Sequence, residues 1–267
     1  MKIGIIGLGV VGNALKNGFE LLGHELFLHD IKFKNTKIED LKDTNIIYVC
    51  VDTPGDSNGK CNISGITLVC NELDTIEYKG IVALKSTIEP GSTKNISENS
   101  KLNICFIPEF LREKSASKDF IENHEILIVG TNCKSTYETI KKSHGNLPKE
   151  SMMVTATEAE LIKYYSNAYK AMKVVFSNAF YEIANKINAD YTNIINGFLK
   201  HKVRQEDYTT VNDLFRGYGG MCLPKDVKAI DNFCKQINLD MKIFETIDSD
   251  NKLYKTTVPK GMRLWKY

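Results

Sequence analysis

Short apolar runs alternate with amphipathic stretches along the first half of the chain. The runs are rich in Ile, Val and Leu and end at Gly, Pro, Ser or Asp, as the buried strands of a parallel sheet do. Several of the stretches between them have helical spacing. The pattern predicts an α/β domain over residues 1–150, with helices on both faces of a parallel sheet. The predicted strands are Ile3 to Ile6, Glu25 to His29, Ile46 to Val51, Ile81 to Leu84, Ile104 to Ile107 and Glu125 to Val129.

The pattern changes after Met153. Thr-Glu-Ala-Glu at residues 157–160 predicts a capping box, and the run from there to about Ile187 contains neither Pro nor Gly. One helix about 45 Å long would result. Its apolar stripe is Leu161, Tyr165, Ala168, Met172, Val175, Ala179, Ile183 and Ile187. Because such a helix needs partners on several faces, we predict an all-α dimerisation domain over residues 151–240. A linker helix from about residue 240 to 254 and a tail would complete residues 241–267.

Three glycines with G-x-G-x-x-G spacing follow the first predicted strand. A helix over residues 13–22 and a second strand ending at Asp30 come next. Such a turn lets a pyrophosphate approach the backbone at a helix N-terminus, and the acidic residue accepts from the adenosine ribose hydroxyls. The sequence therefore predicts a Rossmann-type site that prefers NAD to NADP, although Lys32 and Lys34 would tolerate a 2′-phosphate. The predicted contacts are Gly7, Gly9, Val10, Val11, Gly12 and Asp30.

Three further segments, residues 50–54, 85–91 and 108–113, lie where the third, fourth and fifth strands should end. Ligands of parallel sheets bind at these carboxyl ends. Each segment could equally be turn chemistry, because Pro, Gly, Ser and Asp often follow strands. Three in succession at one edge favour function. The further predicted cofactor contacts are Val51, Thr53, Pro54, Ser86, Thr87 and Glu113.

Residues 217–226 read Gly-Tyr-Gly-Gly-Met-Cys-Leu-Pro-Lys-Asp. The glycines leave room for a ligand against the backbone, and Pro224 suits the first position of a helix. Cys222 would then lie just before a helix N-terminus, whose dipole lowers the pKa of a thiol, and Lys225 acts in the same direction. Taken alone, Cys222 could equally be a buried structural cysteine.

Composition bounds these hypotheses. The 267 residues carry a net charge of +2 and are 42% hydrophobic, which is ordinary for a soluble globular protein and gives no case for nucleic-acid binding. No apolar run approaches the roughly 20 residues of a membrane helix, and the chain begins directly with a strand, so we expect neither a membrane segment nor a signal peptide. The seven cysteines lack metal-ligand spacing. We expect reduced thiols, no metal and a cytoplasmic location.

Taken together, these segments resemble the UDP-glucose and GDP-mannose dehydrogenases. The matching pieces occur in the family's order over about residues 1–255, and the most specific are Pro-Glu-Phe-Leu-Arg-Glu at 108–113 and Gly-Gly-Met-Cys-Leu-Pro-Lys-Asp at 219–226. The resemblance implies an NAD-dependent four-electron oxidation of a nucleotide sugar at C6, with UDP-glucose to UDP-glucuronate as the leading case. It also implies a homodimer and a setting in surface-polysaccharide synthesis.

The resemblance assigns chemistry to particular residues. Cys222 matches the nucleophile that forms a thiohemiacetal and then a thioester. Lys163 and Asn167 match the residues that hold the C6 oxygen, since two donors one helical turn apart can point at the same oxyanion. Without the resemblance, this polar pair would be typical of a solvated helix face.

Further roles follow from the same resemblance. Thr87 and Asp226 match the pair that positions a catalytic water. Glu109 matches the carboxylate proposed as general base, and Glu113 supports substrate and cofactor nearby. The implied substrate contacts are Glu109, Phe110, Leu111, Arg112, Glu113, Lys163, Asn167, Tyr218, Gly219 and Cys222.

The sequence also departs from the family. Asp52 replaces a usual proline, and Glu89 stands where an apolar residue or proline is common. Arg204 and Arg216 are the candidates for an arginine lent by a partner subunit, but neither has the usual offset from Cys222. Since only a short tail follows the predicted linker helix in this sequence, we expect no counterpart of the family's third, Rossmann-like domain.

Two alternatives therefore stay open. The β-hydroxyacid dehydrogenases pair a Rossmann domain with a helical dimer domain and also use a lysine and an asparagine one turn apart, but they do not need Cys222. A non-catalytic NAD-binding partner of a full-length dehydrogenase would fit the departures at Asp52 and Glu89.

Overall fold

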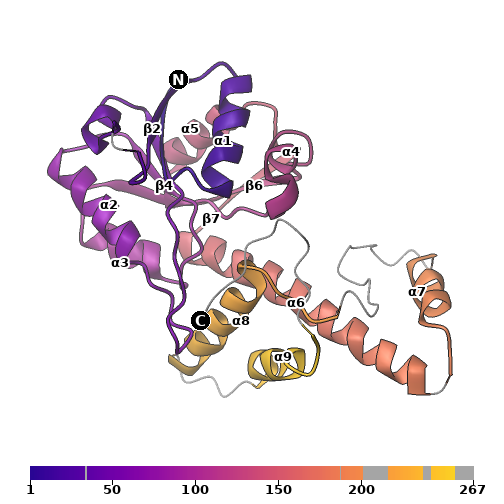
Figure 1. The fold of residues 1–267 in the computed structure, drawn as a ribbon. Helices are drawn as coiled ribbons and strands as arrows, with labels where there is room; N and C mark the ends of the chain where they lie inside the picture. Colours follow the sequence, from indigo (N-terminus) through magenta and orange to yellow (C-terminus); the bar gives the residue numbers. More distant parts are fainter. Residues whose placement is uncertain (34, 187, 201–215, 237–241, 256–267) are drawn as a thin grey trace. The chain divides into compact units, whose positions relative to one another are not determined.

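The computed structural model describes residues 1–33, 35–186, 188–200, 216–236 and 242–255 (Figure 1). It divides into two compact units. The α/β unit comprises Met1–Pro54 and Cys61–Lys163, and the helical unit comprises Gly55–Lys60 and Tyr164–Tyr267. The loop at 55–60 belongs to the helical unit because Gly59, at φ +84°, packs its backbone against Lys228.

The α/β unit is built on a seven-stranded sheet of order β2-β1-β3-β4-β5-β6-β7 within the described residues. Neighbouring strands from β2 to β5 are parallel, whereas β6 is antiparallel to β5 and parallel to β7. The predicted α/β fold is confirmed, while the antiparallel step and the last strand were not predicted. The strands are β1 (Lys2–Ile6), β2 (Glu25–His29), β3 (Ile46–Val49), β4 (Ile81–Leu84), β5 (Asn103–Phe106), β6 (Ile126–Gly130) and β7 (Glu150–Val154).

The strands β2 and β4 have the predicted bounds, whereas the ends of β1, β3, β5 and β6 differ from the predicted ones by one or two residues. The predicted strand over 46–51 ends at Val49, because β1 ends at Ile6 and Gly7 then turns away. The Cys50 amide makes the last hydrogen bond to β1, at 2.7 Å from the Ile6 carbonyl oxygen. Residues 50–54 are therefore a loop at the carboxyl edge of the sheet.

Helices cover both faces of this sheet. On one face Leu15 and Phe19 of α1 (Val10–Leu21), Phe120 of α4 (Ala116–Ile121) and Ile140 of α5 (Lys134–His144) form a continuous apolar core with the strands. The other face packs against Leu41 of η1 (Ile38–Leu41), against α2 (Ser64–Thr75) and α3 (Ser92–Glu98), and against the start of α6 (Ala156–Lys186). The two cores fix the carboxyl edge of the sheet, where the candidate site residues of the α/β unit lie.

The helix α6 is 31 residues long, as predicted, but its cap is not the predicted one. The capping box lies two residues earlier: Glu158 Oε2 accepts from the Thr155 amide at 2.7 Å, and the Glu158 amide donates to Thr155 Oγ1 at 3.3 Å. Glu160 is instead fully buried, where it accepts from the amides of Gly91 and Thr93 at 2.6 and 2.8 Å. The prediction at 157–160 was wrong because this carboxylate caps α3.

The helical unit continues with α7 (Tyr191–Lys200), α8 (Cys222–Gln236) and α9 (Ile243–Asn251). Pro224 is the third residue of α8 rather than the first, which costs no hydrogen bond because the first four amides of a helix have no intrahelical acceptor. The predicted linker helix over about 240–254 is shorter than expected. Its described part is α9, and residues 237–241 lie outside the described residues.

The predicted apolar stripe of α6 is only partly buried. Ala168 is 7% exposed, but Tyr165 is 75% exposed. Beside the stripe, Tyr169 is 45% exposed and Phe176 is 58% exposed. Side chains at positions 179, 183 and 187 lie outside the description. The exposed aromatic side chains leave an apolar strip along the helical unit.

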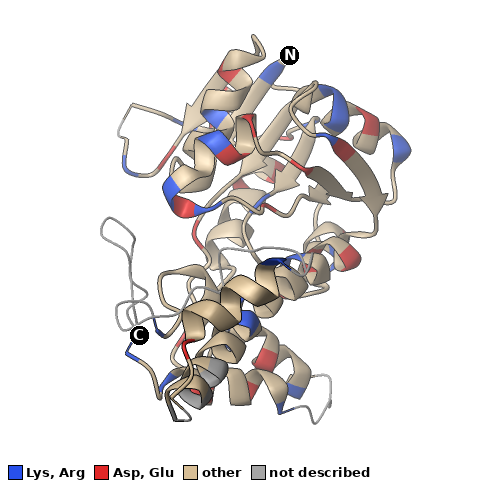
Figure 2. Ribbon diagram, turned by 90° about the vertical axis from the view of Figure 1, so that its right-hand side faces the viewer, with Lys and Arg blue, Asp and Glu red and all other residues tan. Residues whose placement is uncertain are grey.

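Figure 2 shows basic and acidic residues interspersed along the helices and loops of the α/β unit. None of the described helices combines the length and the hydrophobicity that crossing a bilayer requires.

Candidate active site

The glycine turn connects β1 to α1 through a backbone that side chains would not allow. Gly7 has φ +89°, and a Cβ there would lie 2.7 Å from the Cys50 carbonyl oxygen. A Cβ on Gly12 would lie 1.9 Å from the Gly7 carbonyl oxygen, so this glycine lets α1 approach the strand. Gly9 is exposed, and a Cβ on it would meet no protein atom within 4 Å. The space above Gly9 thus faces solvent, as a turn that receives a ligand requires.

The first turn of α1 fits a pyrophosphate. Gly9 caps the helix without a side-chain hydrogen bond, and no acidic residue lies in the first turn. The Val10, Val11 and Gly12 amides therefore form a helix N-terminus of the kind that binds anions.

Asp30 follows β2 and is 8% exposed. Its Oδ2 accepts from the Leu8 amide at 2.7 Å and its Oδ1 from the Lys32 amide at 2.9 Å. Burial raises the pKa of Asp30, but these two amides and the Lys32 charge outweigh it and hold the pKa below its usual value. Each oxygen keeps a lone pair for a ribose hydroxyl, so the ionised carboxylate fits the adenosine end of NAD and also fixes the glycine turn. Lys34 lies outside the described residues.

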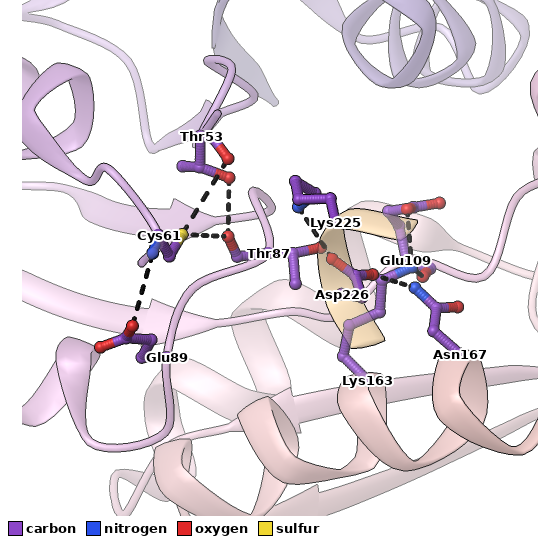
Figure 3. A network of polar contacts seen from close by, with 9 residues as sticks. All are labelled: Thr53, Cys61, Thr87, Glu89, Glu109, Lys163, Asn167, Lys225 and Asp226. Atoms are coloured by element: carbon purple, nitrogen blue, oxygen red, sulfur yellow. Dashed lines mark hydrogen bonds and ion pairs between the residues drawn. The ribbon is translucent and has the colours of Figure 1, made fainter. Parts of the chain in front are cut away.

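The loops after β3 and β4 are tied together at the sheet edge. Thr53 Oγ1 donates to the Thr87 carbonyl oxygen at 2.7 Å, and Ser86 Oγ donates to the Val51 carbonyl oxygen at 2.6 Å. The predicted cofactor contacts Thr53 and Ser86 thus position the backbone of the neighbouring loop. Figure 3 shows Cys61 beside the same carbonyl, with Sγ 3.5 Å from the Thr87 oxygen, and the Cys61 amide 3.4 Å from Glu89 Oε1.

Glu109 and Lys163 form a buried ion pair in the α/β unit (Figure 3). Lys163 Nζ donates to Glu109 Oε1 at 2.9 Å and to the Glu109 carbonyl oxygen at 2.6 Å. The other oxygen, Oε2, accepts from the Leu111 amide at 2.8 Å, and the Phe110 ring centroid lies 5.9 Å from the ammonium. Burial raises the pKa of Glu109, but the charges of Lys163 and Lys85 together with these hydrogen bonds lower it overall. The carboxylate is therefore ionised and orients the Lys163 ammonium.

A second lysine, Lys85, lies at the end of β4 and is only 5% exposed. Burial lowers its pKa to about 8, against the opposing charge of Glu109, and the Lys163 charge lowers it further. The sequence prediction missed this residue. The sequence indicates a role for Lys85 only by its position directly after a fully apolar strand, and the prediction for this segment considered Ser86 and Thr87 instead.

The predicted substrate contact Arg112 pairs with Asp119 of α4. Its Nε and Nη2 donate to the two carboxylate oxygens at 3.0 and 2.8 Å, and its amide donates to Oδ2 at 3.0 Å. The Arg112 hydrogen bond, against burial, holds the pKa of Asp119 well below its usual value. Arg112 thus anchors residues 108–113 and the short helix η2 (Glu113–Ser115) to the α/β unit.

In the helical unit, Cys222 opens α8 and is exposed. Asp226 lies one turn later and is 1% exposed. Asn167 of α6 donates from Nδ2 to Asp226 Oδ2, and Lys225 Nζ lies 2.9 Å from Oδ1 (Figure 3). A carboxylate, an amide and an ammonium are thus gathered one helical turn from the cysteine. Exposure of Cys222 overturns the alternative of a buried structural cysteine.

The glycine loop before Cys222 is also ordered by its surroundings. Tyr218 is 4% exposed, and Gly220 has φ +80°. Arg216, a candidate for donation to a partner subunit, instead donates from Nε to Asn178 Oδ1 at 2.8 Å within its own unit. Arg204 lies outside the described residues.

Comparison with known proteins places the chain in a family context. Residues 30–147 match the NAD binding domain of the UDP-glucose/GDP-mannose dehydrogenase family, and residues 157–253 match the family's central domain. The first match makes NAD the cofactor, in agreement with the glycine turn and Asp30. It does not test the individual site residues, whose roles stay predictions.

Individual relatives agree with the family match. The UDP-glucose 6-dehydrogenase of Rickettsia bellii is 31% identical over 231 residues, which are 83% of this chain and 52% of that protein. The GDP-mannose 6-dehydrogenase of Pseudomonas aeruginosa is 26% identical over 94% of this chain and 68% of its own length. The solved UDP-glucose dehydrogenase of Pyrobaculum islandicum superposes with a TM-score of 0.85 at 22% identity, over 94% of this chain and 68% of that one. The chain spans about half the length of the Rickettsia relatives.

Proposed function

Because this chain belongs to the UDP-glucose/GDP-mannose dehydrogenase family, we propose that it is an NAD-dependent nucleotide-sugar 6-dehydrogenase. It oxidises the C6 hydroxyl of the sugar to a carboxylate through Cys222, with UDP-glucose as the expected substrate. NAD, when bound, accepts a hydride in each of the two oxidations. Two hydrides leave C6 in total, and water supplies the second carboxylate oxygen.

One observation carries this proposal: the hydrogen bond between Asn167 and Asp226 joins the two helices that bear the reactive groups. Cys222 precedes Asp226 by one turn of α8, and Lys163 precedes Asn167 by one turn of α6. A thiol, two oxygen-directed donors and a carboxylate at this spacing are what thioester chemistry at an aldehyde carbon requires.

Each side chain has a defined task in the proposal. The Cys222 thiolate adds to the aldehyde carbon, and Lys163 with Asn167 stabilises the negative oxygen that forms there. Asp226 orients the water that attacks the thioester, since it lies on the same side of α8 as the sulfur. Thr87 is the second predicted water-positioning residue. Glu109 holds the Lys163 ammonium in place and, as an ionised carboxylate, can receive the proton of the C6 hydroxyl.

The test is NADH formation at 340 nm with UDP-glucose and a panel of other nucleotide sugars. We expect two NADH per sugar for the wild type and none for Cys222→Ala. Cys133→Ala is the matched control, because Cys133 is equally an exposed thiol but lies at the start of α5, outside the site. It should keep full activity.

Other outcomes separate the alternatives. One NADH per substrate with full activity in Cys222→Ser would indicate a β-hydroxyacid-type dehydrogenase, which needs no thiol. NAD binding measured by calorimetry, with no turnover on any nucleotide sugar, would indicate a non-catalytic partner subunit.

We also propose that the protein forms a homodimer through α6, supported by the exposed aromatic strip of Tyr165, Tyr169 and Phe176. Light scattering after size exclusion should give twice the 30.1 kDa chain mass. The double variant Tyr165→Glu, Phe176→Glu should be a monomer. The control Leu68→Glu alters a side chain that is also 58% exposed, on α2, and should leave the mass unchanged. A monomeric wild type would overturn this part of the proposal.

A further inference from the structure

The backbone that leads into Cys222 is held by asparagine side chains from two other helices. We propose that Asn251, on α9, is a positioning residue that fixes the loop Gly217 to Met221 and so sets the reactivity of Cys222. The inference rests on the proposed function, which makes Cys222 the nucleophile, and it adds a residue that the sequence prediction did not single out.

Asn251 binds one residue of the loop through both of its functional groups. Its Oδ1 accepts from the Tyr218 amide at 2.8 Å, and its Nδ2 donates to the Tyr218 carbonyl oxygen at 3.0 Å. The Asn251 side chain is 8% exposed and Tyr218 is 4% exposed, so water does not replace these bonds. A reciprocal pair of buried hydrogen bonds fixes both the position and the orientation of the Tyr218 peptide groups.

The residues just before Tyr218 are held in the same way. Asn178, fully buried in α6, donates from Nδ2 to the Arg216 carbonyl oxygen at 2.8 Å and accepts from Arg216 Nε at 2.8 Å. The Arg216 guanidinium lies 4.8 and 4.9 Å from the ring centroids of Tyr181 and Tyr254. These two cation–π contacts tie the start of the loop to α6 and to the segment after α9.

Gly217 completes the attachment. Its amide donates to the Lys255 carbonyl oxygen at 3.1 Å. A Cβ on Gly217 would lie 3.1 Å from Asn251 Oδ1 and 3.2 Å from the Tyr254 carbonyl oxygen, so the loop passes close against α9 and the residues that follow it.

The attachment matters for Cys222 because only three residues separate it from Tyr218, and two of them are glycines. Gly219 and Gly220 have no side chains that could hold the loop by packing, and Gly220 adopts φ +80°. The direction of the chain into α8 is therefore set at Tyr218. If Tyr218 were released, we expect Cys222 to move relative to the amides of the first turn of α8, which favour a thiolate.

Alkylation by iodoacetamide at pH 7.5, followed residue by residue with mass spectrometry, tests this without any sugar or cofactor. The variants are Asn251→Ala, which removes both hydrogen bonds, and Asn251→Asp, which keeps the acceptor for the Tyr218 amide. Ser249→Ala is the matched control, because this exposed side chain lies on the same helix.

Two other cysteines make each sample self-controlled. Cys234 is 6% exposed in α8 and reports unfolding of the helical unit, while the exposed Cys133 of the α/β unit reports reagent activity. Because Cys222 is already exposed, access does not limit its reaction. We expect Asn251→Ala to slow its alkylation by about tenfold, with Asn251→Asp intermediate, Ser249→Ala unchanged and Cys234 still protected.

A Cys222 rate within twofold of wild type in Asn251→Ala, with Cys234 protected, would overturn the inference. The inference would also be overturned if, in both Asn251 variants, every change in the Cys222 rate came with labelling of Cys234. Asn251 would then serve only the folding of the helical unit. Because the assay contains no substrate, a failure of the proposed enzyme activity leaves its result readable.

Discussion

The buried lysine at the end of β4 should lower the stability of the α/β unit at neutral pH. Lys85 is 5% exposed, and burial lowers its pKa from 10.5 to about 8 despite the nearby charge of Glu109. Replacing it with methionine, which has a similar length and no charge, removes the cost of burying the ammonium.

The magnitude follows from the shift. The drop in the Lys85 pKa from 10.5 to about 8 measures how strongly the folded state disfavours the charged form. At about 1.4 kcal/mol per pKa unit, the shift costs the folded state about 3 kcal/mol at pH 7. This shift already includes the attraction between Lys85 and Glu109, and Glu109 keeps its ion pair with Lys163 in the variant. We therefore expect Lys85→Met to be about 1 to 3 kcal/mol more stable than wild type at pH 7.

The pH dependence has a definite sign. Between about pH 8 and 10.5 the unfolded chain still binds the Lys85 proton while the folded protein has released it. The wild type therefore gains stability relative to the variant as pH rises through this window. The difference between the two should shrink to less than about 1 kcal/mol at pH 10.

Urea unfolding read by pulse alkylation of Cys105 measures this in the right unit, since Cys105 is fully buried in β5. Lys79→Met is the control, because Lys79 is an exposed lysine two residues before the same strand. It should change stability by less than about 0.5 kcal/mol. Equal stability of the two variants at pH 7, or a gain in Lys85→Met that does not change with pH, would refute the reasoning.

Three further predictions concern the α/β unit. Glu160→Ala should destabilise it by about 3 kcal/mol or more in the same urea assay, because the amide and hydroxyl of Thr93, 2.8 and 2.6 Å from the carboxylate, lose their acceptor. Gly12→Ala should abolish NAD binding in calorimetry, since its Cβ would lie 1.9 Å from the Gly7 carbonyl oxygen. Burial holds the pKa of His144 well below 6.5. As the pH is lowered below about 6.5, the unfolded chain therefore binds a proton that the folded protein does not, and the melting temperature should decrease. His144→Phe should flatten that fall.

Much of the α/β unit was predictable because its strands are buried on both faces and read as continuous apolar runs. β7 was missed for the opposite reason. It lies at the edge of the sheet, its sequence Glu-Ser-Met-Met-Val has no β-branched run, and Met152 and Met153 are 43% and 44% exposed. An edge strand takes its hydrogen bonds from a neighbour that the local pattern does not reveal.

The start of α6 shows a different limit. The sequence contains two overlapping Thr-x-x-Glu boxes, at 155–158 and 157–160, and local rules do not rank them. The structure uses the first because Glu160 binds the amides at the start of α3, sixty-seven and sixty-nine residues earlier in the chain. A contact so distant in sequence decides where the helix begins, and with it the turn of the helix that bears Lys163.

The candidate site divides in the same way. Lys163, Asn167, Cys222 and Asp226 were singled out because the chemistry of the family that the sequence resembles demands particular side chains, and their roles stay predictions. Asn251 carries no such demand, since its role lies in two hydrogen bonds to a backbone 33 residues away, and any polar residue near a helix end would look alike in sequence. Residues that act through another residue's backbone are therefore found only once the fold brings both together. If the alkylation experiment supports Asn251, the reactivity of Cys222 depends on α9 as much as on the glycine loop that first drew attention to it.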